Sequence, residues 1–266
     1  MYETNYHRAG SVADAAQKMA AADDGKFLGG GQTLLPTMKQ RLAAPSDLVD
    51  VTKIAEMKGI CADGDGVSIG AATTHAEVAS SDLVKQTLPG LASLAGGIGD
   101  PAVRHMGTIG GSIANNDPAA DYPAALVALG ATVVTSKREL AAEAFFTGMF
   151  ETALDEDEVV VSVKFPGAAA SAYAKYPNPA SRYAMAGVFV AKGSDGSVKV
   201  AVTGAGQDGV FRMPEMETAL SGNFSPEAVA GIAPDADGML ADLHGSAAYR
   251  ANLVTVMAKR AVSAAG

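Results

Sequence analysis

Two glycine-dense turns constrain this chain more than any other feature of its sequence. The first occupies residues 28–35 and reads LGGGQTLL, and the second occupies residues 107–114 and reads GTIGGSIA. Each combines small residues with a Ser or Thr hydroxyl, and glycine permits backbone conformations and close approaches that other residues do not. We therefore expect each turn to present free backbone N–H groups. Two such turns suit a diphosphate gripped from both sides, as in a dinucleotide cofactor.

Neither turn matches the common nucleotide-binding motifs. Gly29 and Gly31 open a GxG pattern, but Leu34 stands where GxGxxG requires its third glycine. No Gly-Lys-Ser/Thr follows, which excludes the phosphate loop of nucleotide-hydrolysing enzymes. The predicted order of strand, glycine turn, hydroxyl and helix directs N–H groups and the positive end of a helix dipole to one point. A glycine run alone is equally compatible with a tight turn that binds nothing.

Hydrophobic periodicity divides the chain into helices and strands. Helices are expected at 11–22, 33–43, from 74 onward, and at 88–97, 123–129, 215–221 and 245–263. Strands are expected at 26–28, 47–51, 67–71, 131–135, 159–163, 183–192 and 198–205, the last two joined by a hairpin-like turn. Helices and strands mix without a strict β-α-β alternation, so the predicted fold class is α+β.

Local signals fix two of the expected helix starts. Ser11 is a candidate N-cap for the first helix. Thr74 and Glu77 have the spacing of a capping box, in which each side chain bonds the backbone N–H of the other residue. His75 follows this cap, and we interpret it as a residue that packs at the helix start rather than as a ligand.

The charge balance excludes two classes of partner. A net charge of −9 argues against nucleic acid and against an anionic membrane surface. No apolar run reaches membrane-spanning length, so no transmembrane segment is expected. The first residues lack a basic start followed by an apolar run, so no signal peptide is expected. The sequence therefore predicts a soluble, cytoplasmic protein.

Few residues carry chemistry of their own. The single cysteine, Cys61, cannot form an internal disulfide or hold an iron–sulfur cluster, and we expect a buried, reduced thiol. The four histidines are scattered, and the acidic run at 155–158 is expected to be a solvated loop rather than a metal site. We predict no metal ligand and no catalytic side chain. If the chain is catalytic, a cofactor carries the reaction.

Two aspartates after the second turn have open roles. Asp117 precedes a proline and is a candidate N-cap. Asp121 lies one turn later. It either accepts a hydrogen bond from a ribose or flavin-side group or favours a helix N-terminus through its charge. The residue types alone leave both interpretations of Asp121 open.

The two turns and their flanks resemble a known family. Residues 28–42 and 108–124 resemble the paired FAD motifs of the medium, flavin-binding subunit of molybdenum hydroxylases, a family that includes carbon monoxide dehydrogenase and xanthine dehydrogenase. The stretch DLHGSAAYR at 242–250 is similar to the tail of that family. The resemblance extends over essentially the whole chain, and the paired motifs in this order are highly specific.

The resemblance implies a particular domain organisation. A two-lobed FAD-binding domain of the vanillyl-alcohol-oxidase-like type would occupy residues 1–166, with lobes at about 1–55 and 56–166. A smaller C-terminal α+β domain would occupy residues 172–266, after a boundary at 166–171. FAD would lie between the two domains.

The resemblance also implies a set of cofactor contacts. In the two turns these are Leu28, Gly29, Gly30, Gly31, Gln32, Thr33, Leu34, Thr108, Ile109, Gly110, Gly111 and Ser112. Outside the turns they are Ile98, Asp117, Asp121, Val160 and Lys175. Ile98 would pack on the flavin and Val160 would offer a backbone contact. For Lys175 an ordinary surface lysine is the alternative. Replacing Gly30 or Gly110 by valine is expected to abolish FAD binding without unfolding the chain.

The implied role is electron transfer. FAD on this chain would receive electrons from two-iron two-sulfur clusters of a small subunit and pass them to a quinone, NAD or oxygen. Molybdopterin would lie on a large subunit, and the assembly would be a dimer of heterotrimers. With one cysteine, the chain lacks the insertion that holds a four-iron cluster in some relatives. The alternatives are a stand-alone FAD-dependent oxidase or dehydrogenase and a cofactor-free scaffold.

Overall fold

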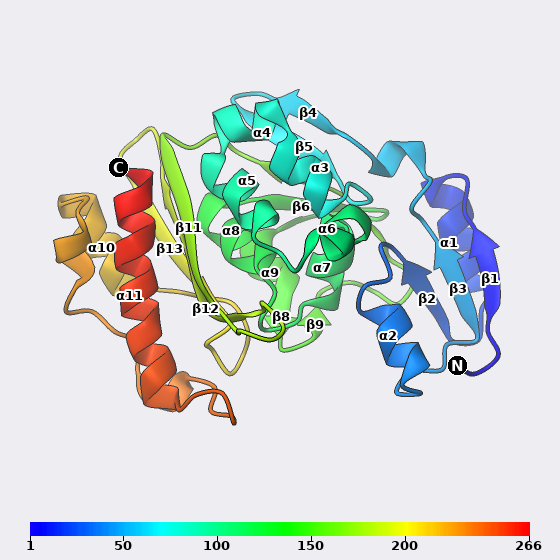
Figure 1. The fold of residues 1–266 in the computed structure, drawn as a ribbon. Helices are drawn as coiled ribbons and strands as arrows, with labels where there is room; N and C mark the ends of the chain where they lie inside the picture. The colour runs from blue at the N-terminus through cyan, green and yellow to red at the C-terminus, as the bar shows by residue number, and fades with distance from the viewer.

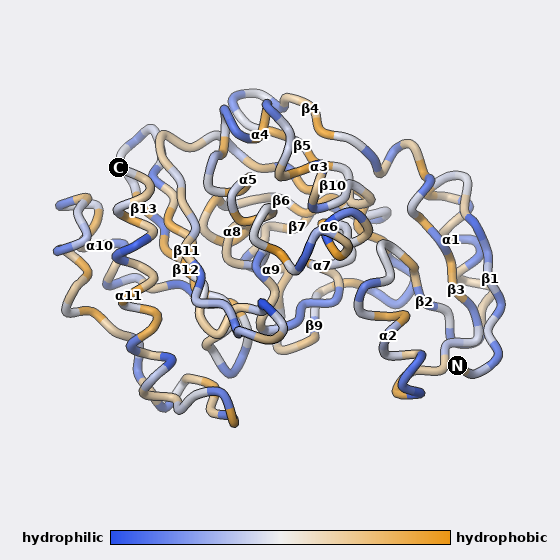
Figure 2. The backbone as a smooth tube through the Cα atoms, in the orientation of Figure 1, coloured by the Kyte–Doolittle hydropathy of each residue, from blue (hydrophilic) through white to orange (hydrophobic).

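A small parallel sheet begins the fold. The computed structural model describes residues 1–266. The sheet has the order β1-β3-β2, and β3 pairs with both neighbours in parallel. Its strands and helices are β1 (Asn5–Arg8), α1 (Val12–Ala20), β2 (Gly25–Leu28), α2 (Leu34–Lys39) and β3 (Asp47–Asp50). Figure 2 shows the contrast between the apolar middle strand β3 and the polar edge strand β1. Ser11 caps α1 as predicted, because its hydroxyl accepts from the Asp14 N–H.

A five-stranded antiparallel sheet forms the middle of the molecule, with the order β4-β5-β10-β6-β7. Its strands are β4 (Ile60–Asp63), β5 (Gly66–Gly70), β6 (Thr132–Thr135), β7 (Glu139–Ala141) and β10 (Val160–Phe165). A separate hairpin pairs β8 (Phe146–Gly148) with β9 (Glu151–Thr152). The helices of this region are η1 (Ala55–Met57), α3 (His75–Ser80), α4 (Asp82–Thr87), α5 (Pro89–Gly96), α6 (Pro101–Met106), α7 (Ile109–Asn115), α8 (Tyr122–Leu129) and α9 (Ala142–Phe145).

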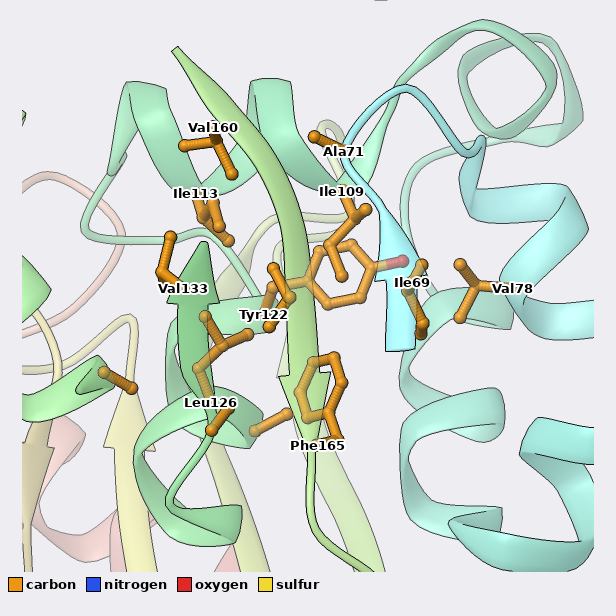
Figure 3. Packing of buried hydrophobic residues seen from close by; sticks show 14 of the residues in the cluster. Ile69, Ala71, Val78, Ile109, Ile113, Tyr122, Leu126, Val133, Val160 and Phe165 are labelled. Atoms are coloured by element: carbon orange, nitrogen blue, oxygen red, sulfur yellow. The ribbon is translucent and has the colours of Figure 1, made fainter. Parts of the chain in front are cut away.

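The middle core gathers around Tyr122, which is fully buried at the start of α8. Figure 3 shows its ring among Ile69 of β5, Ile109 of α7 and Phe165 of β10. The capping box at the start of α3 is present as predicted. The Thr74 N–H donates to the Glu77 carboxylate, and the Glu77 N–H donates to the Thr74 hydroxyl. These contacts fix α3 and α7 against the middle sheet.

The C-terminal region is built on a third sheet, of order β11-β12-β13-β14. Its elements are β11 (Ala170–Pro177), β12 (Ala184–Lys192), β13 (Val198–Thr203), β14 (Phe211–Arg212), α10 (Pro214–Gly222), η2 (Pro226–Val229), η3 (Ala236–Gly238) and α11 (Ala247–Ala265). Helix α11 covers one face of β11 and β12, whereas α5 and α8 pack against the other side of the sheet (Figure 1). Strand β12 is buried almost throughout because both of its faces are covered.

The structure confirms the α+β fold class and corrects several details. The antiparallel pair β12–β13 is confirmed, but β11 was not predicted and begins inside the expected boundary stretch 166–171. The second glycine turn follows helix α6 rather than a strand, and it forms the first residues of α7. No helix is long and apolar enough to cross a membrane.

The expected burial of Cys61 is wrong. Cys61 lies on β4, an edge strand of the middle sheet, and its side chain is exposed. Only Ile60 of this strand is partly buried. An apolar residue type at a strand edge is exposed whenever no second layer covers that strand.

Candidate functional site

A cavity of about 610 Å³ lies where the three regions of the chain meet. The first glycine turn lines it from the N-terminal region, and the second turn lines it from the middle region. Residues 152–160 and 181–183 contribute to its wall from β9 to β10 and from the loop between β11 and β12. The volume is within the range of cofactor and drug-sized binding sites.

The first turn presents an unbroken row of hydrogen-bond donors. It leaves β2 at Leu28 and enters α2 at Leu34, and Gly31 adopts a φ of 69°, which favours glycine. None of the six backbone N–H groups from Gly29 to Leu34 donates to a protein acceptor. Thr33 occupies the N-cap position of α2, but its hydroxyl accepts no hydrogen bond from the first N–H groups of that helix. The donors of this turn are therefore available to a ligand.

The second turn is closed. The Ile109 N–H donates to the Thr73 carbonyl over 3.1 Å, and the Gly110 N–H donates to the Ala71 carbonyl over 2.9 Å. Thr108 is the N-cap of α7, and its hydroxyl accepts from the Gly111 N–H at 3.2 Å. The expectation of free N–H groups at these three positions is wrong, because the strand end before α3 and the cap already satisfy them.

Close packing explains three of the glycines, and at Gly29 and Gly30 the two turns touch each other. A Cβ atom on Gly30 would lie 1.9 Å from the carbonyl oxygen of Met106, and one on Gly29 would lie 2.9 Å from the Thr108 hydroxyl. A Cβ on Gly110 would lie 2.5 Å from that of Ala71. Valine at Gly30 or Gly110 would therefore collide with protein atoms rather than fill the cavity. The expectation that such variants leave the fold intact is not supported.

The structure brings nearly all of the predicted contact residues to one cavity. Those that line it are Leu28, Gly29, Gly30, Gly31, Gln32, Thr33, Leu34, Ile98, Thr108, Gly110, Gly111, Ser112, Asp117, Asp121 and Val160. Ile109 does not, because its side chain points into the core beside Tyr122 (Figure 3). Lys175 lies behind the wall. Which of these residues touch the cofactor stays a prediction.

Asp121, in the cavity wall, forms a buried ion pair with Lys175, which lies behind the wall. The Lys175 Nζ lies 3.0 and 3.2 Å from the two carboxylate oxygens, and the Tyr173 hydroxyl donates to the same carboxylate over 2.6 Å. Burial raises the pKa of Asp121, and the Lys175 charge and the Tyr173 hydrogen bond oppose that rise. The Lys175 side chain is only 10% exposed, so it is not an ordinary surface lysine. Asp121 makes no side-chain cap bond to α8.

Three cationic side chains hold the loop that carries Ile98. Lys175 donates to the Gly97 carbonyl at 2.9 Å. Arg104 donates to the carbonyls of Ile98 and Gly99 at 2.9 and 3.0 Å, and Arg182 donates to the Gly99 carbonyl at 3.2 Å. The position of Ile98 in the cavity wall is thus fixed from α6 and from the C-terminal sheet.

A comparison with known families identifies the chain. Residues 2–168 match the family described as the FAD binding domain in molybdopterin dehydrogenase. The chain belongs to this family. Its cofactor is FAD, and the resemblance inferred from the two motifs is confirmed.

Full-length relatives of this FAD-binding family are similar over nearly the whole chain. The carbon monoxide dehydrogenase medium chain of Hydrogenophaga pseudoflava is 36% identical, over 98% of this chain and 96% of the relative. The nicotine 6-hydroxylase medium subunit of Paenarthrobacter nicotinovorans is 33% identical over the same shares. The structure of carbon monoxide dehydrogenase from Hydrogenophaga pseudoflava, which lacks the Mo-pyranopterin moiety, matches with a TM-score of 0.89 at 37% identity, over 99% and 97% of the two chains.

The residues of the cavity fit FAD. The six free N–H groups of the first turn suit a diphosphate, which accepts hydrogen bonds and carries negative charge. Lys26, two residues before that turn, adds a cation that forms no ion pair with a carboxylate. Ile98, Val103 and Leu28 supply apolar wall that suits a flat ring system. The first turn would hold the diphosphate, and the second, packed against it, would form the adjoining wall.

Asp117 is not a helix cap. Its carboxylate accepts from the Ala119 N–H at 2.8 Å within a turn, and α8 begins only at Tyr122. Burial raises the pKa of Asp117, with the Ala119 N–H opposing the rise. The hydrogen bond within this turn therefore holds the Asp117 carboxylate at the cavity wall.

His75 supports the second turn as a neutral ring. It is 5% exposed, its ring centroid lies 5.4 Å from that of Tyr122, and its Nδ1 has no hydrogen-bond partner. Burial, assisted by the charge of Arg104, lowers the pKa of His75 to about 4. His75 packs at the start of α3 as expected, and the interpretation that it is not a ligand stays a prediction. Its ring also lines the cavity, which the sequence did not indicate.

The acidic run at 155–158 is only partly solvated. Glu158 is 2% exposed and accepts from Arg138 at 2.9 and 3.1 Å. Although burial acts to raise it, the hydrogen bonds from Arg138 and Thr135 lower the pKa of Glu158 to about 2. The expectation of a loop in water is wrong for this residue.

Several cavity residues were missed from the sequence. Lys26 was identifiable in principle, because it precedes the first turn by only a few residues. The loop residues Ser181, Arg182 and Tyr183 carry no local signal, and they reach the cavity because β11 and β12 pair beside it. Arg104 does not line the cavity, but it holds the loop at 97–99 through two backbone carbonyls, and this role was also missed.

Proposed function

We propose that this chain is the FAD-binding electron-transfer subunit of a heteromeric molybdenum hydroxylase. It would stand between iron–sulfur clusters on a small subunit and an external acceptor such as a quinone, NAD or oxygen. The observation that carries the proposal is a row of six N–H groups without protein acceptors, on residues that line a cavity, in a member of this family. The medium-chain and medium-subunit names of its full-length relatives support the same role.

The residues of this chain bind and enclose the cofactor. Hydrogen bonds from backbone N–H groups to a charged phosphate contribute about 1.5–3 kcal/mol each, so the first turn alone can retain FAD on a chain of net charge −9. Ile98, Gly99 and residues 181–183 after β11 would enclose another part of the cofactor. Bound FAD supplies the redox chemistry, because a flavin accepts electrons singly and releases them in pairs.

The domain division forms part of the proposal. An FAD-binding domain at 1–166, with lobes at about 1–55 and 56–166, and a C-terminal domain at 172–266 agree with the three sheets and with a family match that ends at residue 168. The partners would be a large molybdopterin subunit and a small iron–sulfur subunit. The dimer of heterotrimers and the cytoplasmic location stay predictions of the sequence.

Co-purification tests the proposed role. The tagged full-length chain is isolated from its native cells, and the recovered complex is analysed for FAD, molybdenum and iron. We expect FAD on this chain and both metals on two co-purifying subunits. Turnover of a small alcohol by the chain alone would instead support a stand-alone oxidase. A chain that purifies without flavin and is not reconstituted by FAD would exclude both flavin-dependent functions.

A further inference from the structure

A tight hairpin beside the cavity carries two exposed apolar residues at its tip. Strands β8 and β9 are joined by the two-residue turn Met149–Phe150, with Gly148 paired opposite Glu151. Met149 is 41% exposed and Phe150 is 58% exposed. Neither belongs to or packs against the two hydrophobic cores of the chain. The tip therefore presents apolar surface that the fold does not use for its own core.

Phe150 has a backbone conformation that a bulky residue rarely adopts. Its φ is 56°, in the left-handed region where the Cβ of an L-residue crowds the following carbonyl oxygen. Glycine or asparagine normally occupies such a turn position. Burial of the ring does not offset this cost, because most of the ring faces solvent. Strained backbone of this kind concentrates at binding sites, where the side chain has a use outside its own fold.

A buried asparagine holds the hairpin in this shape. Asn116, at 2% exposed, donates from its side-chain amide to the carbonyls of Gly148 and Glu151, both at 2.8 Å. Its own carbonyl accepts from the Phe150 N–H at 3.0 Å. Asn116 is also the C-cap of α7, the helix that the second glycine turn begins. The tip is therefore a rigid projection joined directly to the cavity wall.

The charges around the tip restrict what it can contact. Residues 142–158 contain six carboxylates and no lysine or arginine. Ion pairs from outside the segment engage four of them, whereas Glu151, next to Phe150, has none. An anionic membrane would be repelled. A second copy of this chain meeting tip to tip would bring the same negative charges together.

We propose that Met149 and Phe150 form a docking projection for a partner subunit of the same enzyme, received by an apolar socket with cationic side chains at its rim. This inference rests on the proposed function, which supplies the partner subunits. The exposed aromatic ring suits the centre of such an interface, where aromatic anchors contribute most of the binding energy. The unpaired Glu151 suits its charged rim.

The variant Phe150→Gly separates docking from folding. Glycine removes the ring and relieves the left-handed strain, so the thermal unfolding midpoint and the FAD content of the isolated chain should not fall. Association with the purified partner subunits should weaken by about tenfold or more. Phe150→Leu, which keeps an apolar tip, should restore most of the affinity. Unchanged affinity in Phe150→Gly, or a lower unfolding midpoint, would overturn the proposal.

Arg41→Gly is the matched control. Arg41 is also exposed and has a φ of 64°, but it lies after α2 in the N-terminal region. Its replacement should relieve comparable strain and leave the affinity for the partner subunits unchanged. An equal loss of affinity in both glycine variants would show that the effect does not belong to the tip.

Photo-crosslinking identifies what the tip contacts in the native assembly. With a benzophenone amino acid at position 150, the holoenzyme should yield a crosslink to a partner subunit. A crosslink only to another copy of this chain, or none in an assembled complex, would contradict the proposal. If the wild-type chain assembles with no partner subunits at all, the proposed function fails, and that result is distinct from a change confined to the tip variants.

Discussion

The two glycine turns have similar composition but opposite roles. The first leaves six consecutive N–H groups without a protein acceptor, whereas three N–H groups of the second are bonded to Thr73, Ala71 and the Thr108 hydroxyl. Gly29 and Gly30 in the first turn allow close contact with Thr108 and Met106, and Gly110 in the second lets α7 approach the end of β5. A glycine run therefore indicates close approach, but hydrogen-bond partners decide whether a ligand or the protein itself occupies that space.

The contact between the turns should give the largest effect when it is broken. Gly30→Ala places a Cβ 1.9 Å from the Met106 carbonyl oxygen, and neither backbone can move without displacing its turn. We expect the free energy of unfolding to fall by about 3 kcal/mol and FAD to be lost. Urea denaturation and the flavin content of the purified chain measure the two effects.

Gly222→Ala is the control for this substitution. Gly222 ends α10, and a Cβ there meets nothing within 4 Å. The free energy of unfolding of the Gly222→Ala variant should be unchanged or slightly higher, since alanine favours a helix. If Gly30→Ala were equally well tolerated, the two turns would not be in the tight contact described above.

Acid should weaken the support of the second turn through His75. The unfolded chain binds a proton at this residue near pH 6.5, but the folded chain does so only near pH 4, because the ring is buried beside Arg104. The contribution of His75 to the free energy of unfolding is therefore complete above pH 6.5. It decreases by about 3 kcal/mol as the pH falls toward 4. The difference in unfolding free energy between wild type and His75→Gln should change with pH in that direction. Parallel pH profiles would show that His75 does not stay neutral.

Some of this architecture could be read from the sequence because its causes are local. The Ser11 cap, the Thr74–Glu77 capping box and the β12–β13 hairpin each depend on residues close together in the chain. The first glycine turn was also readable, since β2 and α2 flank it directly.

The missed features depend on tertiary contacts. The second turn was expected to be open because nothing near it in sequence reveals that Thr73 and Ala71 accept its N–H groups. Lys175 was ambiguous for the same reason, since its partner Asp121 lies on another element. Cys61 was misjudged because an edge strand and a central strand have similar sequences.

The two threonines of the turns offer an intermediate test. Both occupy N-cap positions, but only Thr108 uses its hydroxyl to cap a helix. Thr108→Val should lower the free energy of unfolding by about 1 kcal/mol, whereas Thr33→Val should leave it within about 0.5 kcal/mol. Thr33→Val should instead weaken FAD binding by about fivefold or more, through the loss of one hydrogen bond from its hydroxyl. Thermal unfolding of the apo chain and FAD titration distinguish the two. The same response from both variants would remove the distinction between an open and a closed turn.

The smallest effect is expected at Lys26, at the edge of the first turn. Its exposed side chain lines the cavity and forms no ion pair with a carboxylate, so a bound diphosphate would offer it an opposite charge. Interactions between exposed charges contribute only about 0.2–1 kcal/mol and weaken with salt. Lys26→Met should therefore raise the FAD dissociation constant about threefold at low ionic strength and less at high ionic strength. Lys39 is exposed on α2 and does not line the cavity. Lys39→Met should therefore leave the FAD dissociation constant unchanged at both ionic strengths. If both variants weaken binding equally, the effect comes from the total charge of the region, and the open turn holds the diphosphate through its backbone alone.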